Sequence, residues 1–153
     1  MERLYDLFAP ALYRCAWRLL GNDTLAQEAV QELFVGMVRG RSGLAGVRNL
    51  RGYLFLSLRH SAGRVAQRER RQVPAGLDER SLTAAAEDPV DAGGLDAAVR
   101  GLPTDQQEVL LLKIDAGLTF AQIGDALEIS PNTAASRYRY ALERLRRVLE
   151  KDR

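Results

Sequence analysis

The chain has 153 residues, of which 46% are hydrophobic and 27% are charged, and its formal net charge is +2. This composition is typical of a globular protein and excludes a disordered chain, while no apolar run reaches the ~18 residues that a membrane span needs. The single cysteine, Cys15, excludes an intramolecular disulfide, and with the single histidine, His60, it leaves too few ligands for a Cys/His metal site. We therefore expect a protein of the cytoplasm without secretory signal, metal or cofactor.

The charge is distributed unevenly along the chain. Residues 1–71 carry 12 basic and 6 acidic side chains, whereas residues 72–100 carry 2 basic and 6 acidic ones. Residues 101–153 carry 8 of each, but the basic ones gather at the end, where residues 137–153 hold 7 basic and 3 acidic side chains. Two basic segments therefore flank an acidic middle, which suggests two separate surfaces that face anions.

Two amphipathic helices are predicted at the start of the chain. Apolar residues at helical spacing mark the first helix from Leu4 to Leu19, and Gly21 suits the position after its end. Asp23 or Thr24 can cap the second helix, which should run to about Gly40. Its outer face carries Glu28, Gln31 and Glu32, and such a polar face is by itself most often a solvated one.

A third helix is predicted from Leu50 to about Arg71, capped by Asn49 and preceded by a basic, glycine-rich loop over residues 40–46. Its first half is apolar and includes Tyr53. Its second half places cations along one face, at i, i+4, i+8 and i+11: His60, Arg64, Arg68 and Arg71. Like charges at this spacing repel each other, and only Glu69 is available nearby to balance them, so a phosphate backbone is the expected partner.

Residues 72–93 have the composition of a linker, because they are acidic, contain prolines and glycines, and show no sustained periodicity. A short helix is expected over Leu95–Val99. Thr104 should begin the next helix through a capping box with Gln107, and Gly117 should end it.

The stretch from Leu118 to Leu145 predicts a helix-turn-helix. Thr119 and Gln122 form a capping box for the first helix, and a four-residue turn should follow it. Ser130 and Pro131 then start the second helix, whose buried stripe should consist of Ala134, Tyr138, Ala141, Leu145 and Val148. Polar residues near its start lie off that stripe, where a recognition helix meets the DNA major groove: Asn132, Thr133, Ser136, Arg137, Arg139 and Tyr140.

The predicted fold is therefore all-α, with two small helical domains joined by a flexible linker and a helix-turn-helix in the second domain. The first domain should span residues 1–71, the linker 72–93 and the second domain 94–153. We expect no enzyme, because no phosphate-binding loop follows a strand and the paired carboxylates Asp78, Glu79, Glu87 and Asp88 fall in the linker.

In this order, three segments resemble bacterial sigma factors of the extracytoplasmic-function class. LAQEAVQELF, from Leu25 to Phe34, resembles the helix that binds RNA polymerase in that family. GYLFLSLRHSAGRVAQRERR, from Gly52 to Arg71, resembles the segment that melts the promoter and engages its downstream (−10) element. The segment from Leu102 to Leu149 resembles the domain that reads the upstream (−35) element.

The resemblance implies roles for individual residues. Glu28, Gln31 and Glu32 would bind the coiled coil of the polymerase β′ subunit. The downstream element would be engaged by Tyr53, Arg59, His60, Arg64, Arg68 and Arg71. The upstream element would be read from the recognition helix by Asn132, Thr133, Ser136, Arg137, Arg139 and Tyr140. Core RNA polymerase, promoter DNA and an anti-sigma factor are the implied partners, and no membrane insertion is implied.

Some positions depart from the family pattern. Ala134 and Ala135 replace a valine and a basic or polar residue, and Tyr140 replaces an arginine. Glu128 stands at a turn position where glycine is common; there a positive φ would cost on the order of 1 kcal/mol. Two other functions therefore stay open: a stand-alone helix-turn-helix regulator that binds duplex DNA as a dimer, and a sigma-like interaction protein that no longer binds DNA.

Overall fold

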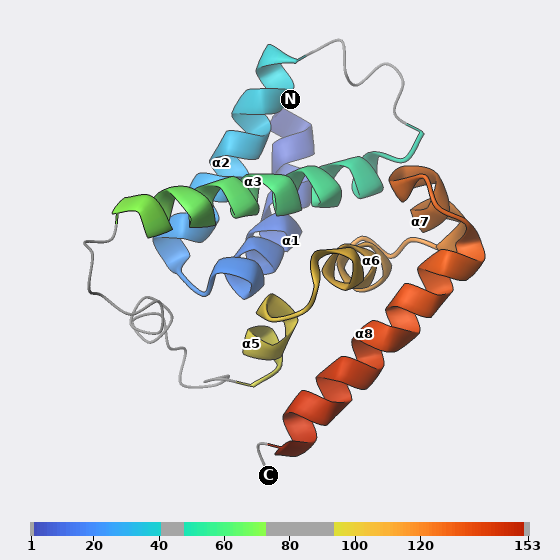
Figure 1. The fold of residues 1–153 in the computed structure, drawn as a ribbon. Helices are drawn as coiled ribbons and strands as arrows, with labels where there is room; N and C mark the ends of the chain where they lie inside the picture. Colours follow the sequence, from blue (N-terminus) through green and yellow to red (C-terminus); the bar gives the residue numbers. More distant parts are fainter. Residues whose placement is uncertain (1, 41–47, 73–93, 152–153) are drawn as a thin grey trace.

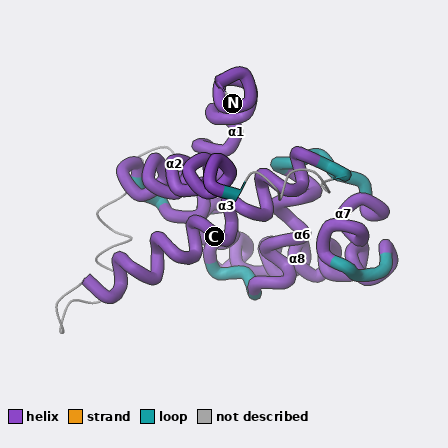
Figure 2. Tube along the Cα trace, turned by 90° about the horizontal axis from the view of Figure 1, so that it is seen from above, coloured by secondary structure: helices purple, strands orange, loops and turns teal. Residues whose placement is uncertain are grey.

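The computed structural model describes residues 2–40, 48–72 and 94–151, and over these ranges the chain is helical without any strand. The helices form two groups, one from each end of the chain (Figure 1). In the view from above, the described part is made of helices with short connections between them (Figure 2). The all-α prediction is confirmed. Except for Gln72, which ends a helix, the predicted linker lies outside the described residues.

The first group consists of α1 (Glu2–Leu20), α2 (Asp23–Arg39) and α3 (Leu50–Gln72). Gly21 between α1 and α2 has a φ of 65°, so the predicted glycine stop is confirmed. Asn49 caps α3 as predicted, because its Oδ1 accepts a hydrogen bond from the Gly52 N–H at 3.0 Å. The three helices bury apolar side chains such as Leu12, Leu33 and Leu58 between them.

The second group consists of α5 (Leu95–Arg100), α6 (Thr104–Ile114), α7 (Phe120–Leu127) and α8 (Pro131–Lys151). The predicted capping box of α7 is present, with Thr119 and Gln122 satisfying each other's backbone N–H groups. The helix-turn-helix is formed by α7 and α8, and α6 packs against both. Its turn has three residues outside the helices, 128–130, and not the four that were predicted.

The two groups share one hydrophobic core. Leu12 and Leu58 from the first group belong to the same buried cluster as Val109, Leu118 and Ile123 from the second. α3 lies between α2 and α6, and it also contacts α7 (Figure 1). The approach is close at Gly52, where an added Cβ would lie 3.0 Å from Leu118 Cδ1. The two halves are therefore packed against each other in this structure.

A cluster of polar contacts fastens the two halves together beside this core. Arg18 of α1 donates from Nη1 to both carboxylate oxygens of Asp115, at 2.8 and 2.9 Å, and from Nε to Asp96 at 3.2 Å. Arg100 of α5 donates to the Arg18 carbonyl at 2.9 Å. Burial disfavours the charge of Arg18, but Asp115, together with Asp96 and Cys15, more than offsets this effect, and the pKa of Arg18 is raised. We call Arg18, Asp96, Arg100 and Asp115 the clasp.

Two predicted helix caps were wrong. The cap of α2 is Asn22, whose Oδ1 accepts from the Leu25 N–H at 3.0 Å, and not Asp23 or Thr24. No capping box starts α6, because Pro103 occupies the N-cap position and offers no side-chain acceptor. Gln107 is buried and donates from Nε2 to the Val99 carbonyl at 3.0 Å, which ties α6 to α5. The Gln107 side chain therefore binds the Val99 carbonyl and does not reach back to cap the start of α6.

Candidate nucleic-acid interface

The tight turn between α7 and α8 depends on two positions. Glu128 has φ 59° and ψ 45°, a left-handed conformation that costs a residue with a Cβ roughly 1–2 kcal/mol. Gly124 is required by close approach, since a Cβ there would lie 2.6 Å from the Ile129 carbonyl oxygen. Ile129 donates to the Gly124 carbonyl at 3.0 Å and closes the turn. The start of α8 is thereby held in a fixed position relative to α7.

Ser130 caps α8 as predicted, because its Oγ accepts from the Thr133 N–H at 3.0 Å. Ala134, Ala141 and Leu145 form the buried stripe of this helix, with Tyr138 partly buried against the core. Val148 does not belong to that stripe, since it is 40% exposed. This part of the prediction was wrong because the helices that α8 packs against do not cover its last turn.

The predicted reading residues surround the first half of α8 on its outer side. Asn132, Arg139 and Tyr140 are exposed, and Thr133, Ser136 and Arg137 are half-buried. The Arg139 guanidinium lies 5.5 Å from the centre of the Tyr140 ring. Arg137 Nε lies 3.7 Å from Asp105 Oδ2 on α6, a long and partly exposed ion pair that contributes little to stability.

The cations of α3 do not stand alone, which corrects the expectation that only Glu69 could balance them. Arg64 Nε lies 2.9 Å from Glu32 Oε1, and Arg68 Nη2 lies 3.0 Å from Glu28 and 2.6 Å from Glu32. The hydrogen bond from Arg68 is the main cause that lowers the pKa of Glu32 below its ordinary value. The structure thus joins two of the predicted polymerase-binding carboxylates to two of the predicted DNA-binding cations.

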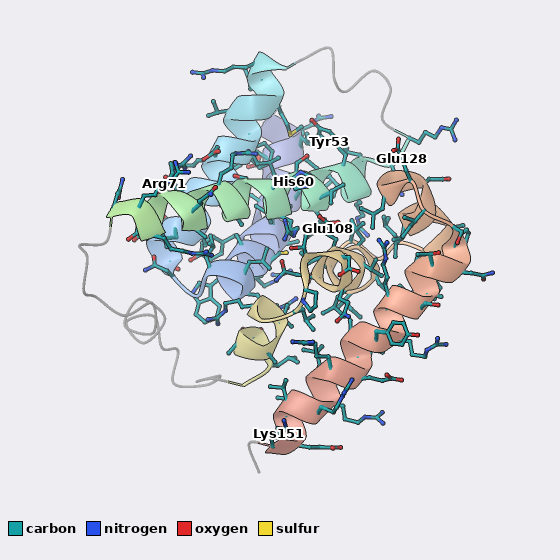
Figure 3. All side chains as sticks on the ribbon, in the orientation of Figure 1. Tyr53, His60, Arg71, Glu108, Glu128 and Lys151 are labelled. Carbon is teal, nitrogen blue, oxygen red and sulfur yellow. The ribbon has the colours of Figure 1, made fainter. Side chains whose placement is uncertain are left out.

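Arg59 and His60 of α3 face the second half of the molecule. Arg59 Nε and His60 Nε2 both lie 3.9 Å from Glu108 Oε1 on α6. The Arg59 side chain is 19% exposed, and its Nε has no hydrogen-bond partner in the described part of the chain. Figure 3 shows Glu108 on α6 below His60, and Arg71 at the exposed end of α3. Arg59 is therefore covered where the two halves meet.

A cavity of about 450 Å³ lies between the start of α3 and α7. Arg48, Asn49 and Tyr53 line it from the first half, and Gln122 and Asp125 line it from the second. Tyr53 is half-buried and also borders a smaller hollow beside His60 and Arg64. The predicted basic, glycine-rich loop over residues 40–46 lies, except for Gly40, outside the described residues.

The described residues bring no three His, Cys, Asp or Glu side chains together in a way that could hold a metal ion. No helix within these ranges is long and apolar enough to cross a membrane.

The chain matches two family models, one in each half. Sigma-70 region 2 matches residues 4–72, and Sigma-70 region 4 matches residues 93–145. The RNA polymerase sigma factor CarQ of Myxococcus xanthus is 29% identical over 155 residues, an alignment that covers 97% of this chain and 88% of the relative.

The fold also matches a solved structure along almost its whole length. That structure is the sigma factor RpoE of Bartonella quintana, crystallised in complex with the anti-sigma factor NepR. The two folds superpose with a TM-score of 0.68 at 22% sequence identity, covering 99% of this chain and 98% of that one.

Proposed function

Since the chain belongs to the extracytoplasmic-function class of RNA polymerase sigma factors, and directs promoter-specific transcription initiation, we propose which surfaces do each part of that work. Residues 1–71 form the domain that binds core polymerase and the downstream promoter element. Residues 94–153 form the domain that reads the upstream element, and residues 72–93 connect the two. We assign no catalytic chemistry to the chain.

The upstream element is read by the first half of α8. The observation that carries this assignment is the fixed start of the helix, where the Ser130 cap and the buried Ala134 point the polar residues outward. Arg137 and Arg139 then bind guanine edges or phosphates, because a guanidinium offers two parallel donors to either. Releasing Arg137 from Asp105 costs little, since that pair is long and partly exposed.

Core polymerase docks on the outer face of α2. Glu28 and Gln31 are exposed there, and Glu32 is half-buried beside them. Val35 follows Gln31 by four residues and is 49% exposed, so the polar face continues into an apolar one. A face with carboxylates, an amide and an uncovered valine suits a partner helix with both basic and apolar side chains.

The downstream element is engaged along α3. His60, Arg64, Arg68 and Arg71 supply the positive charge, and Tyr53 supplies an aromatic ring beside the cavity at the start of the helix. A base taken out of the duplex loses a few kcal/mol of stacking, which an aromatic side chain can partly restore. Arg59 joins this surface only when α6 no longer covers it.

Two further assignments are coarser. We propose an anti-sigma factor as a regulatory partner, supported by the complex in which the similar RpoE structure was crystallised. We also place the chain in the cytoplasm, where a sigma factor meets RNA polymerase.

The test is transcription in vitro with purified core polymerase on a library of promoter-like DNA. We expect sequence-selective transcripts from the wild-type chain, weaker transcription with Gln31→Ala, and altered promoter preference with Arg137→Ala. Arg146→Ala is the control, because it removes the same charge from α8 outside the reading residues. Unchanged promoter preference in Arg137→Ala would refute the assignment of the recognition helix. Undiminished transcription with Gln31→Ala would refute the docking face.

A further inference from the structure

A second cavity, of about 210 Å³, lies where the two halves of the molecule meet. Arg59 and Arg70 of α3 line it from the first half. Arg100 of α5, with Thr104 and Gln107 of α6, lines it from the second half. No aspartate or glutamate is among the described residues that line it. We call this space the junction cavity, and three guanidinium groups from both halves of the chain border it.

The side of α3 that borders the junction cavity differs from the side proposed to bind DNA. Its residues follow one another at intervals of four, three and four, and so lie along one side of the helix: Arg59, Gly63, Ala66 and Arg70. At 100° per residue, this side is roughly 120° around α3 from the row that begins at His60. An added Cβ at Gly63 would meet no described heavy atom within 4 Å, so the small residues leave open space between the two arginines.

The described chain does not fully balance the cations of the junction cavity. Arg59 Nε lies 3.9 Å from Glu108 and is a buried donor without a hydrogen-bond partner in the described ranges. None of the ion pairs within these ranges involves Arg70 or Arg100. Arg100 is held in place by its bond from Nε to the Arg18 carbonyl. An anion in the cavity would supply the missing acceptor and offset the repulsion among the three cations.

The start of α6 adds a further attraction for an anion. Thr104 is its first residue and lines the junction cavity with a side-chain hydroxyl. Pro103, at the N-cap position, offers no side-chain acceptor to the first N–H groups of this 11-residue helix. Asp105 of the same turn does not line the cavity and pairs with Arg137 instead. The positive end of the helix dipole therefore acts together with the three guanidinium groups.

We propose that the junction cavity binds a small anion of the phosphate class, which joins the two halves of the closed chain. A guanidinium group offers two parallel donors that match a pair of phosphate oxygens, and three cations suit an anion with more than one negative charge. Pockets for drug-sized ligands measure about 300–1,000 Å³, so this smaller cavity suits pyrophosphate or the phosphate chain of a nucleotide. Binding requires only the closed arrangement of the halves and does not depend on the proposed promoter contacts.

Isothermal titration of pyrophosphate into the full chain, at constant ionic strength, tests this site. We expect saturable binding of one pyrophosphate per wild-type chain. Arg70→Ala should weaken binding roughly tenfold, which is typical for the loss of hydrogen bonds to a charged group. Arg71→Ala is the matched control, because it removes the same charge from the neighbouring side of α3 and should retain the wild-type affinity. Arg100→Gln keeps a donor for the Arg18 carbonyl and should weaken binding as much as Arg70→Ala does.

Several outcomes would overturn the junction site. One is the absence of saturable binding by the wild-type chain. Another is equal weakening by Arg70→Ala and Arg71→Ala, since general attraction to a basic surface would then explain the binding. Unchanged affinity in Arg100→Gln would place the anion on α3 alone.

Two further ligands identify the source of the phosphate. A nucleoside triphosphate that binds at least as tightly as pyrophosphate, with the same loss in Arg70→Ala, would show that the phosphate chain of a nucleotide is recognised. A much weaker nucleoside triphosphate would restrict the site to the free anion. A single-stranded oligonucleotide that requires Arg70, while pyrophosphate does not, would make Arg70 a DNA contact and overturn the proposal.

Discussion

At the scale of single residues, Glu128 adopts a backbone conformation that is sterically unfavourable for a residue with a Cβ. Its backbone is left-handed, and among the described residues it is the only one besides glycine with a positive φ. A Cβ disfavours this conformation, whereas glycine adopts it freely. The sequence raised this possibility because glycine is common at the corresponding position of the family, and the structure confirms the positive φ.

Replacing Glu128→Gly should stabilise the folded chain by about 1 kcal/mol, since the steric cost outweighs the extra entropy that glycine has when unfolded. Thermal or urea unfolding measures the change. Glu128→Ala is the control, because it removes the charge and keeps the Cβ. Equal stabilisation by both variants would mean that the carboxylate, and not the backbone, causes the effect.

At the scale of helices, ion pairs join the outer surfaces of α2 and α3. Glu28 and Glu32 of α2 form ion pairs with the guanidinium groups of Arg64 and Arg68 on α3. Two surfaces with different proposed partners thus neutralise each other in the free chain. A partner that takes the carboxylates releases the cations, so polymerase binding and DNA binding are expected to support each other.

Replacing Glu28→Gln together with Glu32→Gln should separate these two effects. We expect weaker binding to core polymerase but tighter binding of the free chain to single-stranded downstream DNA, with a salt slope steeper by up to about 1.4 for two freed cations. Filter binding at several salt concentrations measures the slope. Asp23→Asn with Glu69→Gln removes the same two charges without breaking these ion pairs, and an equally large change there would contradict the explanation.

Most helix boundaries could be predicted because capping is local. Asn49, Thr119 and Ser130 each bond to a backbone N–H three residues ahead, so the sequence pattern alone identifies them. Gln107 was misassigned because a distant carbonyl, that of Val99, offers it a buried partner. The pairs from α2 to α3 and from Arg18 to Asp115 were not predicted either, since 32 to 97 residues separate the partners and no local pattern signals them.

At the scale of the whole molecule, the two halves lie closer together than the two promoter elements that we propose they engage. One helix, α6, lies between α3 and α8, so their axes are roughly 20 Å apart at typical interaxial distances. Elements roughly 25 base pairs apart are separated by about 85 Å of straight DNA, at 3.4 Å per base pair. If each half engages the element proposed for it, we expect the clasp and the shared core to open first.

Arg18→Ala should shift the free chain toward open forms. The change leaves Asp115, whose side chain is only 15% exposed, without its guanidinium partner, which costs about 2 kcal/mol for a partly buried carboxylate. Small-angle X-ray scattering should give a radius of gyration near 15 Å if the chain is compact and a value several Å larger after the change. Arg14→Ala is the control, since Arg14 is exposed on the same helix. Equal radii for wild type and Arg18→Ala would show that the apolar core alone keeps the halves together.

The position of Cys15 gives the molecule a built-in reporter. The thiol is buried beside Asp115, and both its burial and that carboxylate raise its pKa, so it is protected from alkylation while the halves are closed. Its labelling rate is then the product of the alkylation rate of an exposed thiol and the fraction of time that the two halves are apart. Iodoacetamide trapping followed over time would thus record the open fraction of the native chain, with no dye and no substitution, and show how core polymerase changes it.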